Sequence, residues 1–390
     1  MNYVTDELAP ILPFPGHNNS EVSMKSNSIA VYLSESFGLG SEKISMKPIG
    51  SGHINSTMLL TAPKKSLVVQ KLNTEVFPEP DMLVKNARLI ERHLTKKRQL
   101  GEYDLAIIRH VPTVENNYLV DCDNGVWRAL EFIGGSYSED VVLNTSQAQT
   151  AANAFGQFAV ALEDFDAKQL HHVIPDFHNL AMRAEKLKAV VAKDPQQRLA
   201  SCQADVDFCF AQFGLIDELK ALTGIVPVRP CHNDTKINNM LFCNTTHKAK
   251  AVIDLDTCMA GFWLYDFGDM VRTFCSPEAE DSTNLHNVVI RKDIFSAIVK
   301  GYVTPLKSSM SKQEQESLLL GAKIMPLMLS VRFLTDYLNN DVYFKVAHAE
   351  HNLERVQNQL ALYKNILSNE EWMHACLVDK QIQDTKKPVS

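Results

Sequence analysis

Residues 230–242 decide the fold, and they read Pro-Cys-His-Asn-Asp-Thr-Lys-Ile-Asn-Asn-Met-Leu-Phe. Asp234 follows a histidine by two residues, Asn239 follows Asp234 by five, and Asp254 ends a β-type run twenty residues after Asp234. Phosphoryl transfer from ATP needs a carboxylate that orients the attacking hydroxyl, and oxygen ligands that hold Mg²⁺ on the phosphates. An Asp and an Asn in one loop are by themselves more often turn residues. Together with Asp254, however, the spacing predicts Asp234 as the catalytic carboxylate, and Asn239 and Asp254 as magnesium ligands.

Composition narrows the classes of protein and partner. The chain has 390 residues, 45% of them hydrophobic, and a formal net charge of −7. These values are typical of a globular protein and exclude general disorder or a fibrous repeat. Nucleic-acid binding needs a basic surface, which an acidic chain does not indicate, and the same balance disfavours an anionic membrane surface. We therefore expect a small-molecule substrate, no nucleic acid and no membrane, and the oligomeric state is left open.

The cysteines and the two ends of the chain indicate a compartment. The eight cysteines contain no Cys-x-x-Cys pair, which is typical of reduced thiols in a cytoplasmic protein. The first residues lack the basic and apolar regions of a signal peptide. The longest apolar stretch, 318–331, contains Lys323 and Pro326 and is too short to span a bilayer. It predicts a buried helix, and the cytoplasm is the expected location.

The pattern along the chain changes from strand to helix near residue 134. We predict an α+β fold with a flexible leader over 1–25 and a small β-rich, nucleotide-binding lobe over 26–134. A larger, mostly helical lobe over 135–370 is predicted to carry catalysis and substrate binding, followed by a tail over 371–390. Within this plan, apolar spacing predicts helices behind Pro80, behind Asn144 and over 351–366, and the pair Ser311 and Glu314 predicts a capping box. Residues 121–125 predict a hairpin turn.

The first lobe also offers candidates for binding nucleotide phosphates. Gly50 and Gly52 lie in a turn between two predicted strands, where glycines allow the backbone to approach phosphates closely. A plain hairpin is the alternative, since the turn is not a Walker A loop. The next strand supplies Lys71 as the cation expected on the phosphates. Its neighbour Gln70 stays an alternative, because a shift of one residue reverses the face of a strand.

Several phrases of the sequence resemble one family. They are Gly-His-Ile-Asn at 52–55, Gln-Lys-Leu-Asn at 70–73, the stretch 231–239, Ile-Asp-Leu-Asp-Thr at 253–257, Tyr-Asp-Phe-Gly-Asp at 265–269 and Arg-Phe-Leu-Thr-Asp-Tyr-Leu at 332–338. Over residues 44–370 the chain resembles the aminoglycoside phosphotransferase and choline kinase superfamily. Within it, the sequence is most similar to bacterial N-acetylhexosamine 1-kinases. The resemblance implies a two-lobed fold like that of protein kinases.

The resemblance also implies a reaction and further site residues. An ATP- and Mg²⁺-dependent kinase of this kind phosphorylates the anomeric hydroxyl of GlcNAc or GalNAc. Backbone groups of Glu131 and Ile133 match the hinge that receives adenine. His53, Arg332 and Tyr343 match positions that bind the sugar, together with the catalytic carboxylate.

Other readings stay open at this point. The same fold could act on another hydroxyl, such as that of choline, homoserine or an aminoglycoside. It could also be a kinase fold that binds ligands without catalysis. A protein kinase is disfavoured, because Asp266-Phe267-Gly268 lies twelve residues past Asp254 and no Ala-Pro-Glu follows to bracket an activation loop. The resemblance instead makes Asp266 a residue that braces the metal loop.

Overall fold

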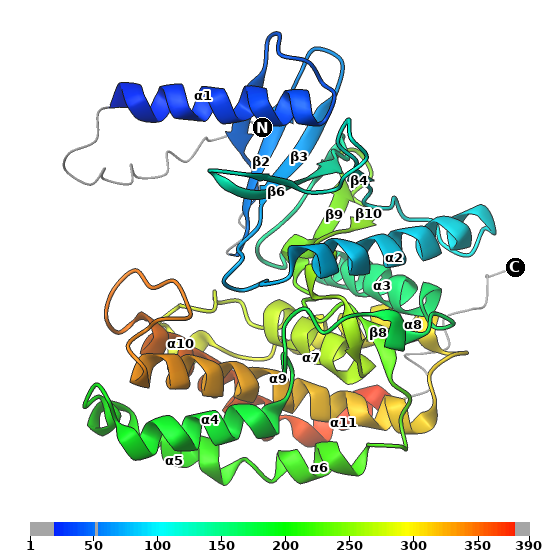
Figure 1. The fold of residues 1–390 in the computed structure, drawn as a ribbon. Helices are drawn as coiled ribbons and strands as arrows, with labels where there is room; N and C mark the ends of the chain where they lie inside the picture. Colours follow the sequence, from blue (N-terminus) through cyan, green and yellow to red (C-terminus); the bar gives the residue numbers. More distant parts are fainter. Residues whose placement is uncertain (1–18, 51–53, 379–390) are drawn as a thin grey trace, which may run out of the picture. The chain divides into compact units, whose positions relative to one another are not determined.

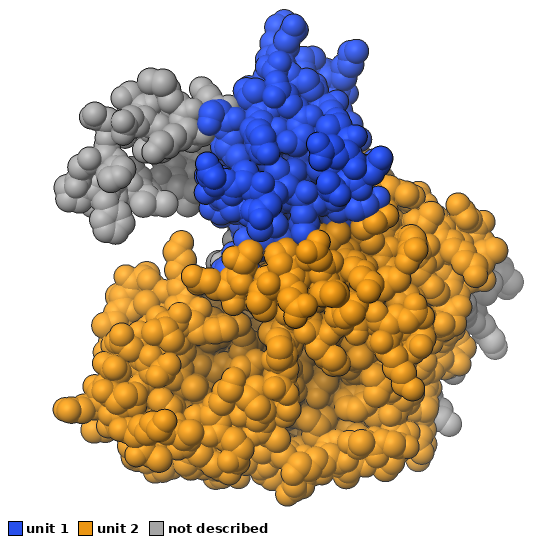
Figure 2. Space-filling view, in the orientation of Figure 1, with its two compact units in different colours: residues 1–73, 110–132 blue, residues 74–109, 133–390 orange. Residues whose placement is uncertain are grey.

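The structure is a computed structural model that describes residues 19–50 and 54–378. It divides into two compact units (Figure 2). Unit 1 takes in residues 1–73 and 110–132, and unit 2 takes in residues 74–109 and 133–390. Each unit is described by itself.

Unit 1 is an antiparallel sheet with one long helix. Its elements are α1 (Asn19–Ser36), β1 (Ser45–Pro48), β2 (Ser56–Thr61), β3 (Ser66–Lys71), β4 (His110–Val111), β5 (Val120–Cys122) and β6 (Gly125–Glu131). The strand order is β1-β2-β3-β6-β4, and β5 pairs with β6. Strands β5 and β6 form the predicted hairpin, and Gly125 there has φ +113°, a conformation that favours glycine.

Alternation along the strands gives the sheet of unit 1 one apolar face. Leu67 and Val69 of β3 share this face with Trp127 and Ala129 of β6, and all four are buried. Helix α1, seen beside the strands in Figure 1, packs Leu33 against the same cluster. Because side chains alternate with a period of two, the residues between them point to the opposite face.

Unit 2 is mostly helical. Its helices are α2 (Pro80–Gln99), α3 (Thr145–Ala161), α4 (Leu180–Lys193), α5 (Leu199–Ala211), α6 (Leu215–Ala221), α7 (Trp263–Phe274), α8 (Lys292–Leu306), α9 (Lys312–Leu338), α10 (His351–Ser368) and α11 (Glu370–Val378). Short 3₁₀ turns lie at η1 (Ala167–Gln169), η2 (Ile237–Asn239), η3 (Leu255–Thr257) and η4 (Leu285–Asn287). Its strands are β7 (Ser136–Tyr137), β8 (Arg229–Cys231), β9 (Met240–Cys243), β10 (Ala249–Val252) and β11 (Met259–Gly261). They form two small sheets, β10-β9-β7 and β11-β8.

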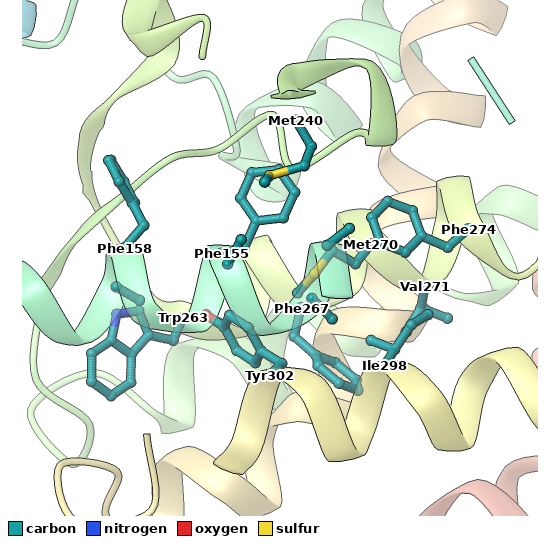
Figure 3. Close-up of a cluster of buried hydrophobic side chains, with 14 of the residues drawn as sticks. Phe155, Phe158, Met240, Trp263, Phe267, Met270, Val271, Phe274, Ile298 and Tyr302 are labelled. Atoms are coloured by element: carbon teal, nitrogen blue, oxygen red, sulfur yellow. The ribbon is translucent and has the colours of Figure 1, made fainter. Parts of the chain in front are cut away.

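The core of unit 2 forms where α3, α7 and α8 meet. Figure 3 shows Phe155 and Phe158 of α3 gathered with Phe267 of α7 and Tyr302 of α8, and all four are buried. Helix α9 packs on α7, α10 and α4. It is long and apolar enough to span a membrane by length and composition, yet 83% of its most apolar window is buried inside the molecule. It is therefore a core helix, as the stretch 318–331 predicts.

Most of the local predictions are confirmed. The fold is α+β, with a sheet in the N-terminal region and helices in the C-terminal region. Asn144 caps α3 through a bond from the backbone N–H of Gln147, and the capping box of Ser311 and Glu314 opens α9. Both follow from the ability of these side chains to accept the free N–H groups of a first helical turn.

Three segments differ from the predicted plan. Helix α2, placed with the first lobe by sequence, belongs to unit 2, where the Asn86 amide donates to the carbonyls of His171 and Cys258. Residues 371–378 are not tail but part of α11, which buries Met373. Residues 19–25 of the predicted leader lie in α1, and residues 1–18 lie outside the described residues. In the first two cases, contacts distant in sequence decide the packing.

Candidate active site

Asp266 holds the loop that carries Asp234 through hydrogen bonds. The two carboxylate oxygens of Asp266, at the start of α7, accept the backbone N–H groups of His232 at 3.0 Å and Asn233 at 2.7 Å. The Thr235 hydroxyl donates to the backbone carbonyl of Asp266 at 2.6 Å. Burial raises the pKa of Asp266 to about 7, against the lowering effect of the two N–H bonds. Asp266 therefore braces the loop on both sides of Asp234, the role that the resemblance implies for it.

Asp234 is surrounded by donors. Lys236 Nζ lies 3.1 Å from its Oδ1, and Asn239 Nδ2 donates to its Oδ2 at 2.8 Å. Burial opposes ionisation, but the charge of Lys236 and the bonds from Lys236 and Asn239 outweigh it and hold the pKa of Asp234 below its usual value. Asp234 is therefore a carboxylate at neutral pH, as a group that accepts a proton must be.

Asn239 and Asp254 are brought together by the hairpin of β9 and β10. Asn239 immediately precedes β9, and its backbone carbonyl accepts the N–H of Ile253 at 2.9 Å. Asp254 is the next residue and has φ +60° and ψ +64°, a left-handed conformation that turns the chain out of the strand direction. The ring of the buried His232 bonds the carbonyl of Ile253 at 2.9 Å. The three residues predicted from spacing therefore gather at one end of this hairpin.

The donor atoms suit Mg²⁺. Because the amide nitrogen of Asn239 is engaged by Asp234, its oxygen is the atom available to a cation, and Asp254 adds a carboxylate. Magnesium prefers such oxygen ligands and is usually held by one or two carboxylates together with substrate phosphates. Within the described part of the chain, no group of three or more His, Cys, Asp or Glu side chains could hold a metal by itself. A metal at Asn239 and Asp254 would therefore take its remaining ligands from a nucleotide and water.

A second group of side chains lies beside the Asp234 loop and is called the acceptor cluster here. Its members are Phe177, His178, Arg183, Arg332, Tyr343 and Phe344. The guanidinium of Arg332 lies 5.4, 5.6 and 5.2 Å from the ring centres of Phe177, Tyr343 and Phe344. Such distances are typical of cation–π contacts. The predicted residues Arg332 and Tyr343 are thus brought together, with 3.5 Å between Arg332 Nη2 and the Tyr343 hydroxyl.

Buried Asp336 fixes the loop that carries Tyr343. Its two carboxylate oxygens accept the backbone N–H groups of Tyr343 at 2.8 Å and Phe344 at 2.9 Å, and Asn352 donates to one of them at 3.0 Å. The aromatic part of the acceptor cluster is therefore anchored to α9 and α10.

The sequence analysis missed four cluster members, Phe177, His178, Arg183 and Phe344. His178 Nε2 lies 3.3 Å from the carbonyl of Asn233, the residue before Asp234, and its ring packs on Phe177. Burial and then the charge of Arg332 lower the pKa of His178 to about 3, so this ring is neutral. Arg183 buries its Nε without a hydrogen bond, and burial and Arg332 lower its pKa to about 10. No local motif marks either residue, because packing of α4 on α9 brings them here.

A family model described as "Phosphotransferase enzyme family" matches residues 45–284. The chain belongs to this family. The match includes the whole Asp234 loop, the β9–β10 hairpin and Asp266. The general expectation of a phosphotransferase that uses an alcohol group as acceptor is confirmed.

Solved structures similar to this phosphotransferase share its fold. A microcompartment-associated aminopropanol kinase has a TM-score of 0.56 and 13% identity, over 90% of this chain and 99% of that one. An aminoglycoside phosphotransferase from Alicyclobacillus acidocaldarius subsp. acidocaldarius DSM 446 has a TM-score of 0.54 and 15% identity, over 97% and 98%. A spectinomycin phosphotransferase in complex with ADP and spectinomycin has a TM-score of 0.50 and 13% identity, over 88% and 98%. At these identities the likeness establishes the fold.

Of the remaining predicted residues of the phosphotransferase, Gly50 and Glu131 belong to unit 1 and Ile133 to unit 2. Gly50 has φ +71° at the end of β1, consistent with the predicted turn, while Gly52 and His53 lie outside the described residues. Glu131 ends β6 with its carboxylate 3.8 Å from Lys65. The carbonyl of Ile133 accepts a bond from the Ser136 hydroxyl. These assignments stay predictions.

The motif Asp266-Phe267-Gly268 has a structural explanation. It lies inside α7, where a Cβ on Gly268 would lie 2.2 Å from the carbonyl oxygen of Gly321 on α9. The glycine thus allows two helices to cross closely, and Asp266 braces a loop. Both roles are structural.

Proposed function

We propose that the protein is an ATP- and Mg²⁺-dependent kinase that phosphorylates the anomeric hydroxyl of an N-acetylhexosamine, GlcNAc or GalNAc, to the sugar 1-phosphate. The sequence phrases around Asp234 and Arg332 support this choice within the family. The charge of the acceptor cluster supports it independently and is the observation that carries the proposal.

The two arginines of the acceptor cluster form no close ion pair among the described residues, although Asp176 and Glu280 act on them from a distance. Neither Arg183 nor Arg332 forms an ion pair with any carboxylate in the ranges 19–50 and 54–378. Burial and the charge of Arg332 lower the pKa of Arg183, against the raising effect of Asp176. A further cation brought beside these two guanidinium groups would meet the same repulsion. Aminopropanol, choline and most aminoglycosides are cations. This cluster is therefore poorly suited to them.

The aromatic rings lead to the same conclusion. A quaternary ammonium group is usually bound inside a cage of aromatic faces. Here the rings of Phe177, Tyr343 and Phe344 already surround the guanidinium of Arg332, so a cation of the protein itself takes that place. A neutral sugar, by contrast, can accept hydrogen bonds from guanidinium groups and lie against aromatic walls.

The residues of the site have distinct roles in the proposed reaction. Asp234 accepts a hydrogen bond from the attacking hydroxyl and takes up its proton, and its low pKa keeps it ready to do so. Asp266 holds the loop so that the carboxylate keeps its direction. Asn239 and Asp254 would hold Mg²⁺, which neutralises the charge that develops on the phosphates.

Homoserine is the second candidate acceptor. It is a zwitterion, and its carboxylate suits the unpaired guanidinium groups of Arg183 and Arg332. The cluster thus favours acceptors that are neutral or carry a carboxylate over acceptors that are only cationic.

An acceptor panel tests the proposal. ADP release would be measured with GlcNAc, GalNAc, homoserine, choline, ethanolamine and an aminoglycoside, and the product would be assigned by phosphorus NMR. We expect turnover on an N-acetylhexosamine with the phosphate on the anomeric oxygen. Turnover on choline or an aminoglycoside with none on the sugars would overturn the proposal. Nucleotide binding without turnover on any acceptor would favour a binding protein instead.

A further inference from the structure

The strand register of unit 1 separates the two candidates for the phosphate-binding cation. Lys71 lies opposite Trp127, and Gln70 lies opposite Arg128. Trp127 belongs to the face that α1 and the apolar core cover. Lys71 therefore points to the covered face, and Gln70 and Arg128 share the opposite one.

The surroundings of Lys71 agree with this placement. A Cβ on Gly125 would lie 2.7 Å from Lys71 Cε, so the stem of the lysine lies against the start of β6. The adjoining part of the same face is filled by Val69, Trp127 and Ala129, all buried. A ligand at the centre of this face would have to displace the core, and Lys71 lies half-buried at its edge.

On the opposite face, three side chains form a hydrogen-bonded row across three strands. The Gln70 oxygen accepts from Arg128 Nε at 2.9 Å and from Arg128 Nη2 at 2.7 Å. The Gln70 nitrogen donates to the Thr57 hydroxyl at 3.1 Å. Because both ends of the amide are engaged, its orientation is fixed, and it holds the guanidinium fork in one place.

This row begins at the glycine turn. The carbonyl of Thr57 accepts the N–H of Ile49, the residue before Gly50, at 3.1 Å. The turn is the predicted phosphate-binding element, so the row extends from it along the face opposite α1. Among the described residues of β1, β2, β3 and β6, this face carries two cations, Arg128 and Lys47. Lys47 is exposed on the edge strand, whereas Arg128 is buried and held by Gln70.

We propose that Arg128 supplies the positive charge that binds the nucleotide phosphates, and that Gln70 positions it. The charge expected from a lysine on β3 thus comes from the neighbouring strand β6. A guanidinium suits this task because its planar array of donors can bond phosphate and Gln70 at once. The inference rests on the proposed nucleotide-dependent function.

Calorimetric titrations of the full chain with ATP, ADP and adenosine test this assignment. We expect Arg128→Met to weaken ATP and ADP binding by about 10-fold or more, as for the loss of a charge-assisted hydrogen bond. Adenosine binding should stay within about 2-fold, because adenosine has no phosphate. Arg128→Lys keeps the charge but loses the planar array of donors, so its ATP affinity should lie between those of the wild type and Arg128→Met. The ATP affinity of Gln70→Ala should lie in the same range. Lys64→Met removes an exposed charge from the turn before β3 and serves as the matched control.

The outcomes separate this inference from the proposed function. An equal loss of ATP and adenosine binding in Arg128→Met would mean a structural role and overturn it. Unchanged ATP binding in Arg128→Met would also overturn the inference, as would a larger loss of ATP affinity in Lys71→Met than in Arg128→Met. If Arg128→Met does not fold, Arg128→Lys and Gln70→Ala decide by the same ratio of ATP to adenosine binding. A wild-type chain that binds no ATP would instead reject the proposed function.

Discussion

The side-chain amide of Asn239 donates a 2.8 Å hydrogen bond to the carboxylate of Asp234. One contact thus links the proposed base to a proposed metal ligand, and it orients the Asn239 oxygen away from Asp234. The loop length between the two residues makes this contact possible. It also means that a change at Asn239 removes a donor from Asp234, so the two residues should be coupled.

Replacing Asp234 by Asn should abolish proton acceptance while keeping the shape of the loop. We expect kcat to fall by about 10²–10⁴-fold, the usual contribution of a general base. ATP affinity should change little, because nucleotide binding does not depend on the transfer of the acceptor's proton to Asp234. Asp293→Asn, on an exposed carboxylate of α8, is the control. Retention of most of the activity in Asp234→Asn would show that another group takes the proton.

Loss of a metal ligand should appear in the magnesium dependence. Asn239→Ala and Asp254→Ala each remove an oxygen donor, and we expect the Mg²⁺ concentration for half-maximal activity to rise by about 10-fold or more. A chelator should abolish activity in the wild type, and added Mg²⁺ should restore it. Asn244→Ala, on the exposed β9–β10 turn, should leave the titration unchanged. An unchanged titration in both ligand variants would remove them from the metal site.

Arg183 should affect the acceptor and not the nucleotide. Its Nε is buried without a hydrogen bond, so an acceptor oxygen would satisfy a donor that is otherwise unsatisfied. We expect Arg183→Leu to raise KM for the acceptor by about 10-fold, with KM for ATP unchanged. Because a desolvated charge is removed, the melting temperature should not fall. Lys186→Met on the exposed side of α4 is the control. A parallel rise in both KM values would indicate a structural defect.

The parts of the site that the sequence predicts are those whose chemistry is local. Asp234 and Asn239 are five residues apart in one loop, so the short turn η2 brings them into contact. His178 and Arg183 could not be found in this way, because they reach the cluster through packing of α4 on α9.

The choice between Gln70 and Lys71 depends on distant pairing. The face of β3 is set by its register with β6, and by which face α1 covers. A strand with apolar residues at both parities carries no local signal for this choice. Distant contacts likewise assign α2, helical as predicted, to unit 2 and not to the predicted first lobe.

Asp266 should make the stability of the protein depend on pH. Its pKa is raised from 3.8 to about 7, mainly by burial, so the folded state holds a proton that the unfolded state releases. The resulting stabilisation is complete below about pH 4 and is lost as pH rises through about 7. The variant Asp266→Asn does not titrate and loses one acceptor for a backbone N–H. We expect it to lower the free energy of unfolding by about 1–3 kcal/mol. Urea unfolding from pH 5 to pH 8 should show the deficit of the variant shrinking as pH rises. A deficit that grows over this range would mean that the folded state holds the ionised form more tightly.

Gly321 should be required for the crossing of α7 and α9. A Cβ there would lie 1.9 Å from the carbonyl oxygen of Leu264, a backbone atom that cannot move aside without shifting α7. Gly321→Ala should therefore destabilise the protein by about 1–3 kcal/mol or more, the usual range for overpacking. Gly214→Ala meets no atom within 4 Å and should leave the melting temperature nearly unchanged.

The crossing also sets α7, which carries Asp266, against α9, which carries Arg332. We therefore expect a folded Gly321→Ala protein to lose kcat as well as stability, and equal kcat at a lower melting temperature would show that the site tolerates movement of these helices.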